Sequence, residues 1–355
     1  MNEPFRPAQT LAEVARQATL EPLEPGDPRY VDLSAGQETR DLKLLRQYVE
    51  DQDANERRYV LAAFSGHRGC GKTTQLRRLE NDLAPRFTSV HVYADESLLQ
   101  DPDLDYPDLM LWEFDARKHP LDERLLADVV EWFASRTQED VKILRAEAKA
   151  EAEAEASGKT GLYFVSLRML ARIKSMVQGS VERRQTVRRE LQRYSTDLIG
   201  RVNELLDGAA RVLEQNGKAP DLLIVQDNLD RLTAEPAARV FIENGDLLGK
   251  LNAHVIYTAP VAIVLSAAAS TGQVFQRRYT LPTVKVQQKS GPPHRRGIDA
   301  LVTLVAARAD LDKVFASRSV IRHLAQMSGG SVRDLMRLLF EAQSLARADD
   351  KDRID

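Results

Sequence analysis

An apolar segment, a glycine-rich turn and a leucine-patterned segment follow one another near the start of the chain. The turn reads SGHRGCGKTTQ over residues 65–75, and the apolar run RRYVLAAF precedes it. Leu76, Leu79 and Leu83 follow it at helical spacing. Glycines let the backbone curl with its N–H groups pointing inward, and a helix start adds positive charge at the same place. Strand, glycine loop and helix together form the context in which G-x-x-x-x-G-K-[ST] is a phosphate-binding loop.

The polar residues of this loop have expected tasks. We expect Lys72 to reach the β- and γ-phosphates of a nucleotide and the Thr73 hydroxyl to bind Mg²⁺. The alternative is a glycine-rich turn that contains Gly-Lys-Thr by chance, which the flanking strand and helix disfavour. The predicted nucleotide-binding residues are Gly66, His67, Arg68, Gly69, Cys70, Gly71, Lys72, Thr73 and Thr74.

Composition and charge narrow the class of protein. The 355 residues are 43% hydrophobic and 29% charged, with a formal net charge of −3, and a chain of this length has room for about two or three domains. The near balance of charge argues against a polybasic nucleic-acid binder, although not against a local basic patch. Cys70 is the single cysteine, so neither a disulfide framework nor a cysteine zinc site is expected.

The sequence contains no targeting or membrane pattern that we recognise. The start, MNEPFRPAQT, lacks the positively charged region and apolar stretch of a signal peptide. The most apolar run, APVAIVLSAAAS, is shorter than the ~20 residues that a membrane helix needs. We therefore expect a cytoplasmic protein with no membrane span.

Strand and helix patterns alternate along the chain. After the loop helix, apolar runs with strand character occur in TSVHVYAD, PDLLIVQDNLD, AHVIYTAP and RRYTLPTVKV, and from about residue 297 the pattern is helical. This order predicts an α/β fold: a P-loop parallel sheet with a C-terminal helical lid. The expected organisation is an N-terminal tail and linker helix over 1–57, an ATPase core over 58–290 and the lid over 291–355. We expect the proline-dotted residues 1–29 to form a loosely docked tail.

Residues 121–217 interrupt this alternation with two long helical patterns. The second, over 181–217, has apolar residues three and four apart and ends at Asn-Gly. We interpret the region as a helical insertion that projects from the core. Its arginine-rich stretch RRQTVRRELQR could contact nucleic-acid phosphates, pair with the glutamate-rich residues 151–155 or remain in water, and we favour the latter two.

Polar residues stand where several of these elements begin or end. Asp227 ends an apolar strand, where a carboxylate can hold Mg²⁺; the alternative is a core strand with a polar end. Thr258 ends the next strand, where it could touch the γ-phosphate or the attacking water; the alternative is simple strand propensity. Ser331 and Asp334 form a capping-box-like helix start that places Arg333 in its first turn, and the alternative for Arg333 is a solvated side chain.

Taken in order, these segments resemble the AAA+ ATPases. Phe64–Thr74 resembles Walker A, Ile224–Asp230 Walker B, Thr258 sensor 1 and GGSVRDL, which contains Arg333, sensor 2. The similarity is greatest to the prokaryotic branch related to origin-recognition initiators and STAND-type switch ATPases. It covers residues 30–120 and 218–346.

The resemblance implies ATP and Mg²⁺ as ligands, ATP hydrolysis as the reaction and a homo-oligomer as the working form. AAA+ proteins generally complete each site with an arginine finger from a neighbouring subunit. Arg278, with Arg277 beside it, precedes the fifth strand, where such a finger is often found; the alternative is a pair of surface arginines.

One position departs from the pattern of an active AAA+ motor. A glutamate usually follows the Walker B aspartate, but here the residue is Asn228, which cannot accept a proton at neutral pH. Losing a general base costs about 10²–10⁴-fold in rate. Asp230 can take over this task if the chain turns immediately after the strand. We therefore expect slow basal hydrolysis with Asp230 as the residual base.

Three functions remain open from the sequence. The first is an ATP-hydrolysing oligomer that acts on a macromolecular partner, in a DNA transaction or a phage-defence type of system. The second is an ATP-gated assembly switch with little turnover that controls a separate effector. The third is a small-molecule kinase, which the distant Walker B segment and the helical lid disfavour. A protein partner is expected for the first two, and nucleic acid is left open.

Overall fold

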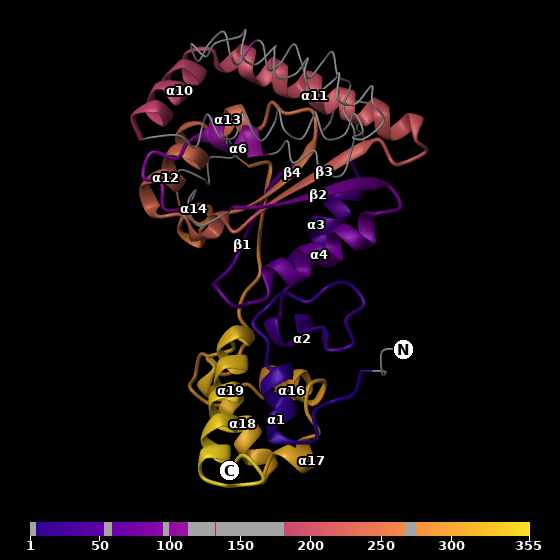
Figure 1. The fold of residues 1–355 in the computed structure, drawn as a ribbon, viewed down its shortest axis with the longest axis vertical. Coiled ribbons are helices and arrows are strands. Elements are labelled where there is room, and N and C mark those ends of the chain that lie inside the picture. The colour runs from indigo at the N-terminus through magenta and orange to yellow at the C-terminus, as the bar shows by residue number, and fades with distance from the viewer. Residues whose placement is uncertain (1–4, 53–58, 95–98, 113–131, 133–180, 267–274) are drawn as a thin grey trace, which may run out of the picture. The chain divides into compact units, whose positions relative to one another are not determined.

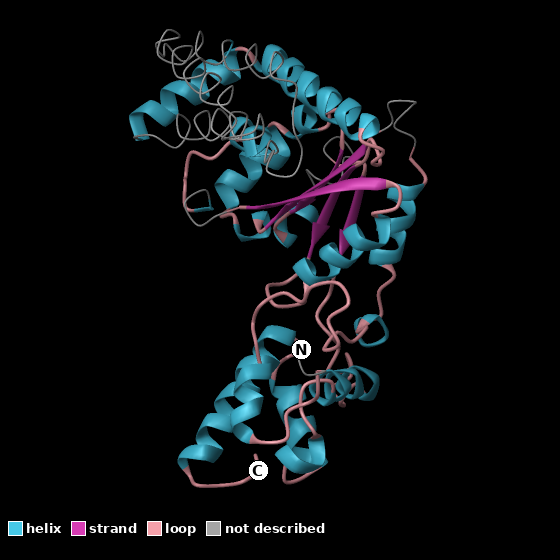
Figure 2. Cartoon of the chain, turned by 45° about the vertical axis from the view of Figure 1, so that its right-hand side comes forward, coloured by secondary structure: helices cyan, strands magenta, loops and turns pink. Residues whose placement is uncertain are grey.

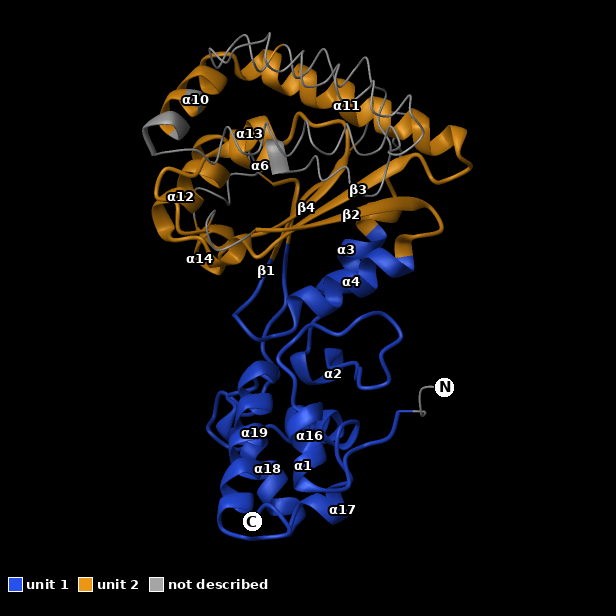
Figure 3. Cartoon of the chain, in the orientation of Figure 1, with its two compact units in different colours: residues 1–47, 65–82, 279–355 blue, residues 48–64, 83–278 orange. Residues whose placement is uncertain are grey.

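The computed structural model describes residues 5–52, 59–94, 99–112, 132, 181–266 and 275–355 (Figure 1). Most of the first half of the predicted insertion, including the glutamate-rich residues 151–155, lies outside these ranges. The chain divides into two compact units (Figure 3). The first comprises residues 1–47, 65–82 and 279–355, and the second comprises residues 48–64 and 83–278. The predicted domain boundaries after residues 57 and 290 stay a prediction.

A five-stranded sheet of order β2-β3-β4-β1-β5 forms the centre of the α/β fold. Its strands run parallel in the pairs β1–β4, β3–β4 and β2–β3. Gln276 directly precedes β5, and its N–H donates to the carbonyl oxygen of Leu61 in β1 at 3.1 Å. This bond ties the start of β5 to β1. The strands are β1 (Leu61–Ser65), β2 (Phe87–Tyr93), β3 (Asp221–Asp227), β4 (His254–Thr258) and β5 (Arg277–Thr280). The predicted parallel α/β sheet is therefore confirmed.

The register brings the carboxyl ends of neighbouring strands to one edge. Tyr93 at the end of β2 lies opposite Asp227 at the end of β3, and Phe64 of β1 lies opposite Thr258 at the end of β4. All residues of β1 and β4 are buried, as expected for parallel strands that are covered on both faces. The polar residues predicted at strand ends consequently share this edge.

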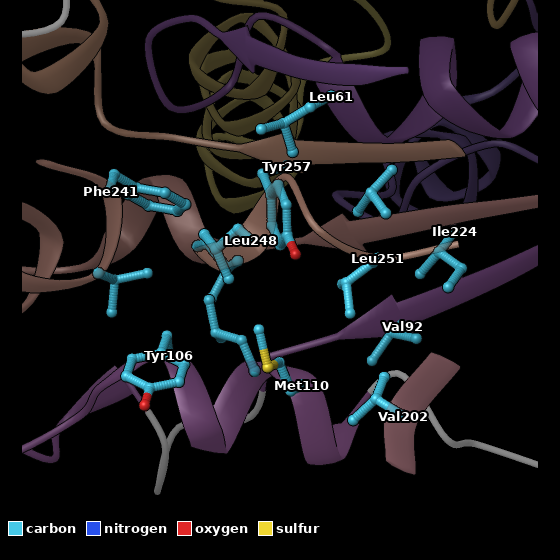
Figure 4. Packing of buried hydrophobic residues seen from close by; sticks show 14 of the residues in the cluster. Leu61, Val92, Tyr106, Met110, Val202, Ile224, Phe241, Leu248, Leu251 and Tyr257 are labelled. Atoms are coloured by element: carbon cyan, nitrogen blue, oxygen red, sulfur yellow. The ribbon is translucent and has the colours of Figure 1, made fainter. Parts of the chain in front are cut away.

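Helices pack on the sheet around the larger apolar cluster. Figure 4 shows Val92, Ile224 and Tyr257 from the strands meeting Met110 of α6 and Val202 of α11. Within the described residues of the second unit, the helical elements are α6 (Tyr106–Trp112), α10 (Val181–Arg193), α11 (Ser195–Gln215), the 3₁₀ helix η3 (Leu229–Arg231), α12 (Ala234–Ala238), the π-helical turn η4 (Arg239–Glu243), α13 (Gly245–Leu248) and α14 (Val261–Val264).

The described part of the predicted insertion does not project from the core. Leu198, Val202 and Leu205 of α11 are buried in the same cluster as the sheet residues. The expectation of a projecting insertion is therefore wrong for α11, because its apolar stripe covers the sheet. The predicted single helix over 181–217 is also divided, since Tyr194 separates α10 from α11 with φ −114°.

A second apolar cluster joins the two ends of the chain. Leu11 and Val14 of α1 are buried together with Leu335 and Leu339 of α19. The prediction of a loosely docked N-terminal tail is therefore wrong for this segment, because α1 contributes to the core of its unit. The remaining helices are α1 (Leu11–Gln17), α2 (Ser34–Gln37), α3 (Asp41–Glu50), α4 (Lys72–Leu83), α16 (Arg295–Ala306), α17 (Leu311–Val314), α18 (Arg318–Met327) and α19 (Val332–Ala348).

The C-terminal part is built from helices, as predicted (Figure 2). Leu301, Leu304 and Val305 of α16 are buried against residues of α18 and α19 in the second cluster. Within the ranges that the structure describes, no helix is both long enough and apolar enough to cross a membrane.

Candidate functional site

The predicted phosphate loop is a tight turn between β1 and α4. β1 ends at Ser65 and α4 begins at Lys72. A Cβ atom added to Gly66 would lie 2.4 Å from the carbonyl oxygen of Leu281, so only glycine permits this close approach. Gly69 has φ +90°, in the left-handed region where residues with a Cβ are strained. The loop therefore depends on its glycines for close packing and for backbone conformation.

Lys72 lies in this loop rather than in solvent. Its side chain is almost buried, with 7% of the residue exposed. The ammonium group donates to the carbonyl oxygens of Gly66 at 2.8 Å and His67 at 3.1 Å. The predicted phosphate-binding cation is thus held at the loop by short contacts to its backbone.

The start of α19 lies against the same loop. The N–H of Arg333 donates to the carbonyl oxygen of Gly69 at 3.2 Å. A Cβ on Gly69 would lie 2.6 Å from Ser331 Oγ and 2.8 Å from Arg333 Cβ. Ser331 caps α19 by accepting from the N–H of Asp334 at 3.2 Å, which confirms the predicted helix start. The structure therefore brings together two predicted segments that are about 260 residues apart in the sequence.

The N-terminal segment contacts the loop and its helix at several points that we did not predict, among them Gln37 and Leu23. Gln37 is 3% exposed. Its side-chain amide donates to the carbonyl oxygen of Pro282 at 2.9 Å and reaches that of Cys70 at 3.5 Å. The N–H of Leu23 donates to Thr74 Oγ1 at 3.2 Å. A buried glutamine in a short helix has no local pattern that would have indicated these contacts.

Asp227 ends β3 as predicted, and its side chain is 1% exposed. One carboxylate oxygen accepts from the N–H of Asn228 at 2.7 Å. The other lies 3.5 Å from Nε2 of His91 on the neighbouring strand β2. His91 is not among the residues predicted for the site; its one sign in the sequence is an ionisable side chain within the strand pattern TSVHVY.

Thr258 is fully buried, and its hydroxyl fixes the chain that leaves β3. Oγ1 donates to the carbonyl oxygen of Gln226 at 3.2 Å and accepts from the N–H of Leu229 at 3.0 Å. These bonds join the end of β4 to the turn after Asp227. The predicted contact of Thr258 with the γ-phosphate or with water stays a prediction.

Asn228 occupies the left-handed conformation, with φ 71° and ψ −3°. Asparagine tolerates this conformation better than glutamate does. The 3₁₀ helix Leu229–Arg231 begins directly after it, so the chain turns at once and carries Asp230 away from the strand direction. This immediate turn is the condition stated above for Asp230 to act as a base, and its catalytic role stays a prediction.

Arg277 and Arg278 are the first two residues of β5, not residues that precede it as expected from the sequence, and both are exposed. Arg278 donates from Nη1 to the carbonyl oxygen of Val264 at 3.2 Å. The guanidinium of Arg277 lies 5.4 Å from the ring centre of Tyr48. An exposed Arg278 fits either of the predicted alternatives, finger or surface pair, so its role in a neighbouring subunit stays a prediction.

One arginine of the stretch RRQTVRRELQR is buried, which corrects our interpretation of it as solvated or paired with residues 151–155. Arg188 is 5% exposed. Its guanidinium lies 2.6 Å from a carboxylate oxygen of Asp101 and 2.8 Å from one of Asp108. Burial raises the pKa of Asp108 to about 6, although Arg188 opposes this shift. This arginine therefore anchors α10 both to α6 and to the segment before it, and is not available to phosphates.

In the part of the chain that the structure describes, no group of three or more His, Cys, Asp or Glu side chains could form a metal site by itself. An Mg²⁺ ion would therefore depend on a few protein oxygens together with nucleotide phosphates. This arrangement is usual for Mg²⁺, which retains several waters and binds one or two carboxylates.

Comparisons with known proteins find similarity in structure. No protein-family model matches the sequence, and no curated protein matches it. The ORC1 protein of Aeropyrum pernix, solved in complex with DNA, is 15% identical with a TM-score of 0.41; the alignment covers 96% of this chain and 65% of that one. The ORC2 protein of the same organism, solved as ADPNP–ADP complexes, is 12% identical with a TM-score of 0.42, over 96% of this chain and 68% of that one. The chain thus spans about two thirds of the length of these proteins.

Proposed function

We propose that the protein is an ATP-binding, slowly ATP-hydrolysing AAA+-type ATPase. The observation that supports this proposal is the glycine-dependent turn between β1 and α4, which holds the ammonium group of Lys72. Its backbone N–H groups and the positive end of α4 are suited to phosphate oxygens. Nucleoside triphosphates are the ligand class that this combination binds in P-loop proteins.

The Mg²⁺ site in this proposal consists of Thr73 and Asp227. A hydroxyl and a carboxylate are oxygen donors of the kind that Mg²⁺ prefers. The ion would neutralise charge on the phosphates during hydrolysis. The bond from the N–H of Asn228 and the proximity of His91 orient the Asp227 carboxylate for this task.

Hydrolysis is proposed to be slow because Asn228 cannot act as a base. Asp230 is the proposed base, and Thr258 holds the turn that positions it through its bonds to Gln226 and Leu229. Arg333 is proposed to sense the nucleotide, since its backbone already contacts Gly69.

We further propose a cytoplasmic homo-oligomer that acts on a macromolecular partner, with Arg278 as the finger toward the neighbouring subunit. A mixture of Arg278→Ala and Asp227→Ala proteins tests this finger, since intact interfaces can form between the two variants. Recovered turnover supports a shared site, and no recovery at any mixing ratio contradicts it.

An ATP-gated switch with little turnover is the second candidate, and Asn228 is the observation that favours it. Two measurements separate the candidates. Phosphate release from ATP without an added acceptor demonstrates hydrolysis and excludes a kinase that needs one. Light scattering with ATP and with ADP reports assembly, so ATP-dependent mass without phosphate release identifies the switch.

A further inference from the structure

The segment that joins β5 to α16 has an unusual charge. Residues 285–296 read KVQQKSGPPHRR and contain four Lys or Arg residues, one His and no Asp or Glu. We call this segment the basic hairpin. Most of its residues are exposed, including Lys289, Arg295 and Arg296. The near-neutral charge of the whole chain therefore conceals a strongly positive local surface.

Backbone hydrogen bonds brace the basic hairpin. The N–H of His294 donates to the carbonyl oxygen of Val286 at 2.9 Å, and that of Gln288 donates to Pro292 at 2.8 Å. At its base, the N–H of Lys285 donates to the carbonyl oxygen of Gly36 at 3.0 Å. The cations are thus presented on an ordered support, which reduces the entropy that a ligand would have to remove on binding.

Some of the charge of the hairpin is already balanced within the protein. The ammonium group of Lys285 pairs with Glu38, and Nε2 of His294 lies 3.1 Å from the other oxygen of the same carboxylate. Lys289, Arg295 and Arg296 form no ion pair with any residue that the structure describes. Three exposed cations therefore remain available to an anion.

The position of the arginines increases the local positive potential. Arg295 and Arg296 are the first two residues of α16, a helix of 12 residues. Cations at this end of a helix oppose the helix dipole and cost stability. An external anion would offset that cost. An open cavity of about 590 Å³ lies beside these two arginines, which line it together with Gln288, Pro292 and Pro293 of the hairpin.

We propose that the basic hairpin binds the phosphodiester backbone of a nucleic acid. Lys and Arg together with exposed Gln and Ser side chains are the residues that contact phosphates and sugars. An acidic protein partner fits less well, because residues 287–296 contain no aromatic or large aliphatic side chain. Tyr, Trp and Arg supply most of the binding energy in protein interfaces and lysine is depleted there; of those three residue types the hairpin contains arginine alone.

The proposal predicts binding without base specificity and with a steep dependence on salt. Each phosphate contact that is lost lowers the slope of log K against log salt by about 0.9. The proposal does not depend on ATP binding, so it can fail or succeed independently of the proposed ATPase.

The test is fluorescence anisotropy of a labelled 30-base-pair DNA duplex with the full chain, without nucleotide, over a salt series. The variant K289Q/R295Q/R296Q removes the three available cations. The control K313Q/R318Q/K351Q removes equal charge from exposed cations that already pair with carboxylates. We expect at least a tenfold loss of affinity and a slope lower by about two to three for the first variant, with the control close to wild type.

Several outcomes would overturn the proposal: no duplex binding by the wild type at 50 mM salt, an equal loss in the control, or an unchanged slope in the hairpin variant. Stronger binding of a polyglutamate peptide than of the duplex would identify an acidic protein as the occupant instead. The single variant K289E guards against misfolding, since Lys289 is exposed at the tip of the hairpin. It should retain the wild-type melting temperature and still weaken duplex binding.

Discussion

The backbone N–H of Arg333 lies 3.2 Å from the carbonyl oxygen of Gly69 and donates a hydrogen bond to it. This bond joins the first turn of α19 to the predicted phosphate loop. A change in the loop backbone, such as phosphate binding would bring, therefore acts directly on the helix start that Ser331 caps. Loop and helix should respond together to substitutions at Gly69.

Gly69→Ala should destabilise the protein and weaken ATP binding. The new Cβ would meet Ser331 Oγ at 2.6 Å and Arg333 Cβ at 2.8 Å, in addition to the strain at φ +90°. Gly291→Ala is the matched control, because Gly291 has φ +101° and nothing within 4 Å of an added Cβ. We expect about 1 kcal/mol of destabilisation for Gly291→Ala from backbone strain and about 2–3 kcal/mol for Gly69→Ala. Equal losses in urea unfolding would show that the contact with α19 does not matter.

Thr258→Val should loosen the turn after β3. The substitution keeps the shape of the side chain but leaves the buried N–H of Leu229 without its 3.0 Å partner. The expected cost is about 1–3 kcal/mol of unfolding free energy. Thr258→Ser retains the hydroxyl and should restore most of this loss. If the valine variant is as stable as the wild type, the hydroxyl does not hold this turn.

Asp230→Asn should lower ATP hydrolysis by about 10²–10⁴-fold, as the loss of a general base does, and leave ATP affinity unchanged. Asn228→Glu restores a carboxylate after Asp227, and we expect hydrolysis equal to or faster than wild type. Because Asn228 has φ 71°, the glutamate variant should also lose about 1 kcal/mol of stability. Wild-type hydrolysis by Asp230→Asn would leave Asp230 with a structural role only.

His254 should make the protein less stable in mild acid. It is buried, Nδ1 accepts from the N–H of Val60 at 3.2 Å, and burial lowers its pKa from 6.5 to about 4. The unfolded chain takes up a proton near pH 6.5 but the folded protein does so only near pH 4, so stability falls as the pH decreases through this window. The loss from this group between pH 7 and 4.5 is about 2 kcal/mol.

The variant His254→Asn isolates this contribution, because the asparagine oxygen can accept from Val60 but does not titrate. Its unfolding free energy should change less between pH 7 and 4.5 than that of the wild type. Parallel pH profiles of the two proteins would contradict the assignment.

Local patterns were sufficient to predict the glycine-rich turn between β1 and α4, the strand that ends at Asp227 and the cap at Ser331. Each depends on residues that are neighbours in the sequence, so periodicity and residue type reveal it. The buried Arg188 could not be predicted in this way, because its partners Asp101 and Asp108 are about 80 residues away and burial depends on tertiary packing.

Asn228 shows a different limit of prediction from the sequence. From the sequence, an asparagine in place of glutamate has a purely chemical meaning, the loss of a base. The structure adds a conformational one, since the chain turns through φ 71° at this residue and asparagine is among the residues that accept this conformation. The backbone dihedral angles of a single turn depend on its tertiary surroundings. Here the turn follows the end of β3 and is fixed by the hydroxyl of Thr258, which is distant in the sequence.

Calorimetric titration of ATP–Mg²⁺ into the wild type and into Lys72→Ala tests the central claim most directly. Lys43→Ala serves as the control, because Lys43 lies on α3 outside the phosphate loop. We predict saturable binding to the wild type and to Lys43→Ala, and at least a tenfold weaker affinity for a folded Lys72→Ala protein, since the variant loses the cation at the loop. Equal ATP affinity of the wild type and Lys72→Ala would contradict the assignment of residues 66–74 as the nucleotide-binding loop.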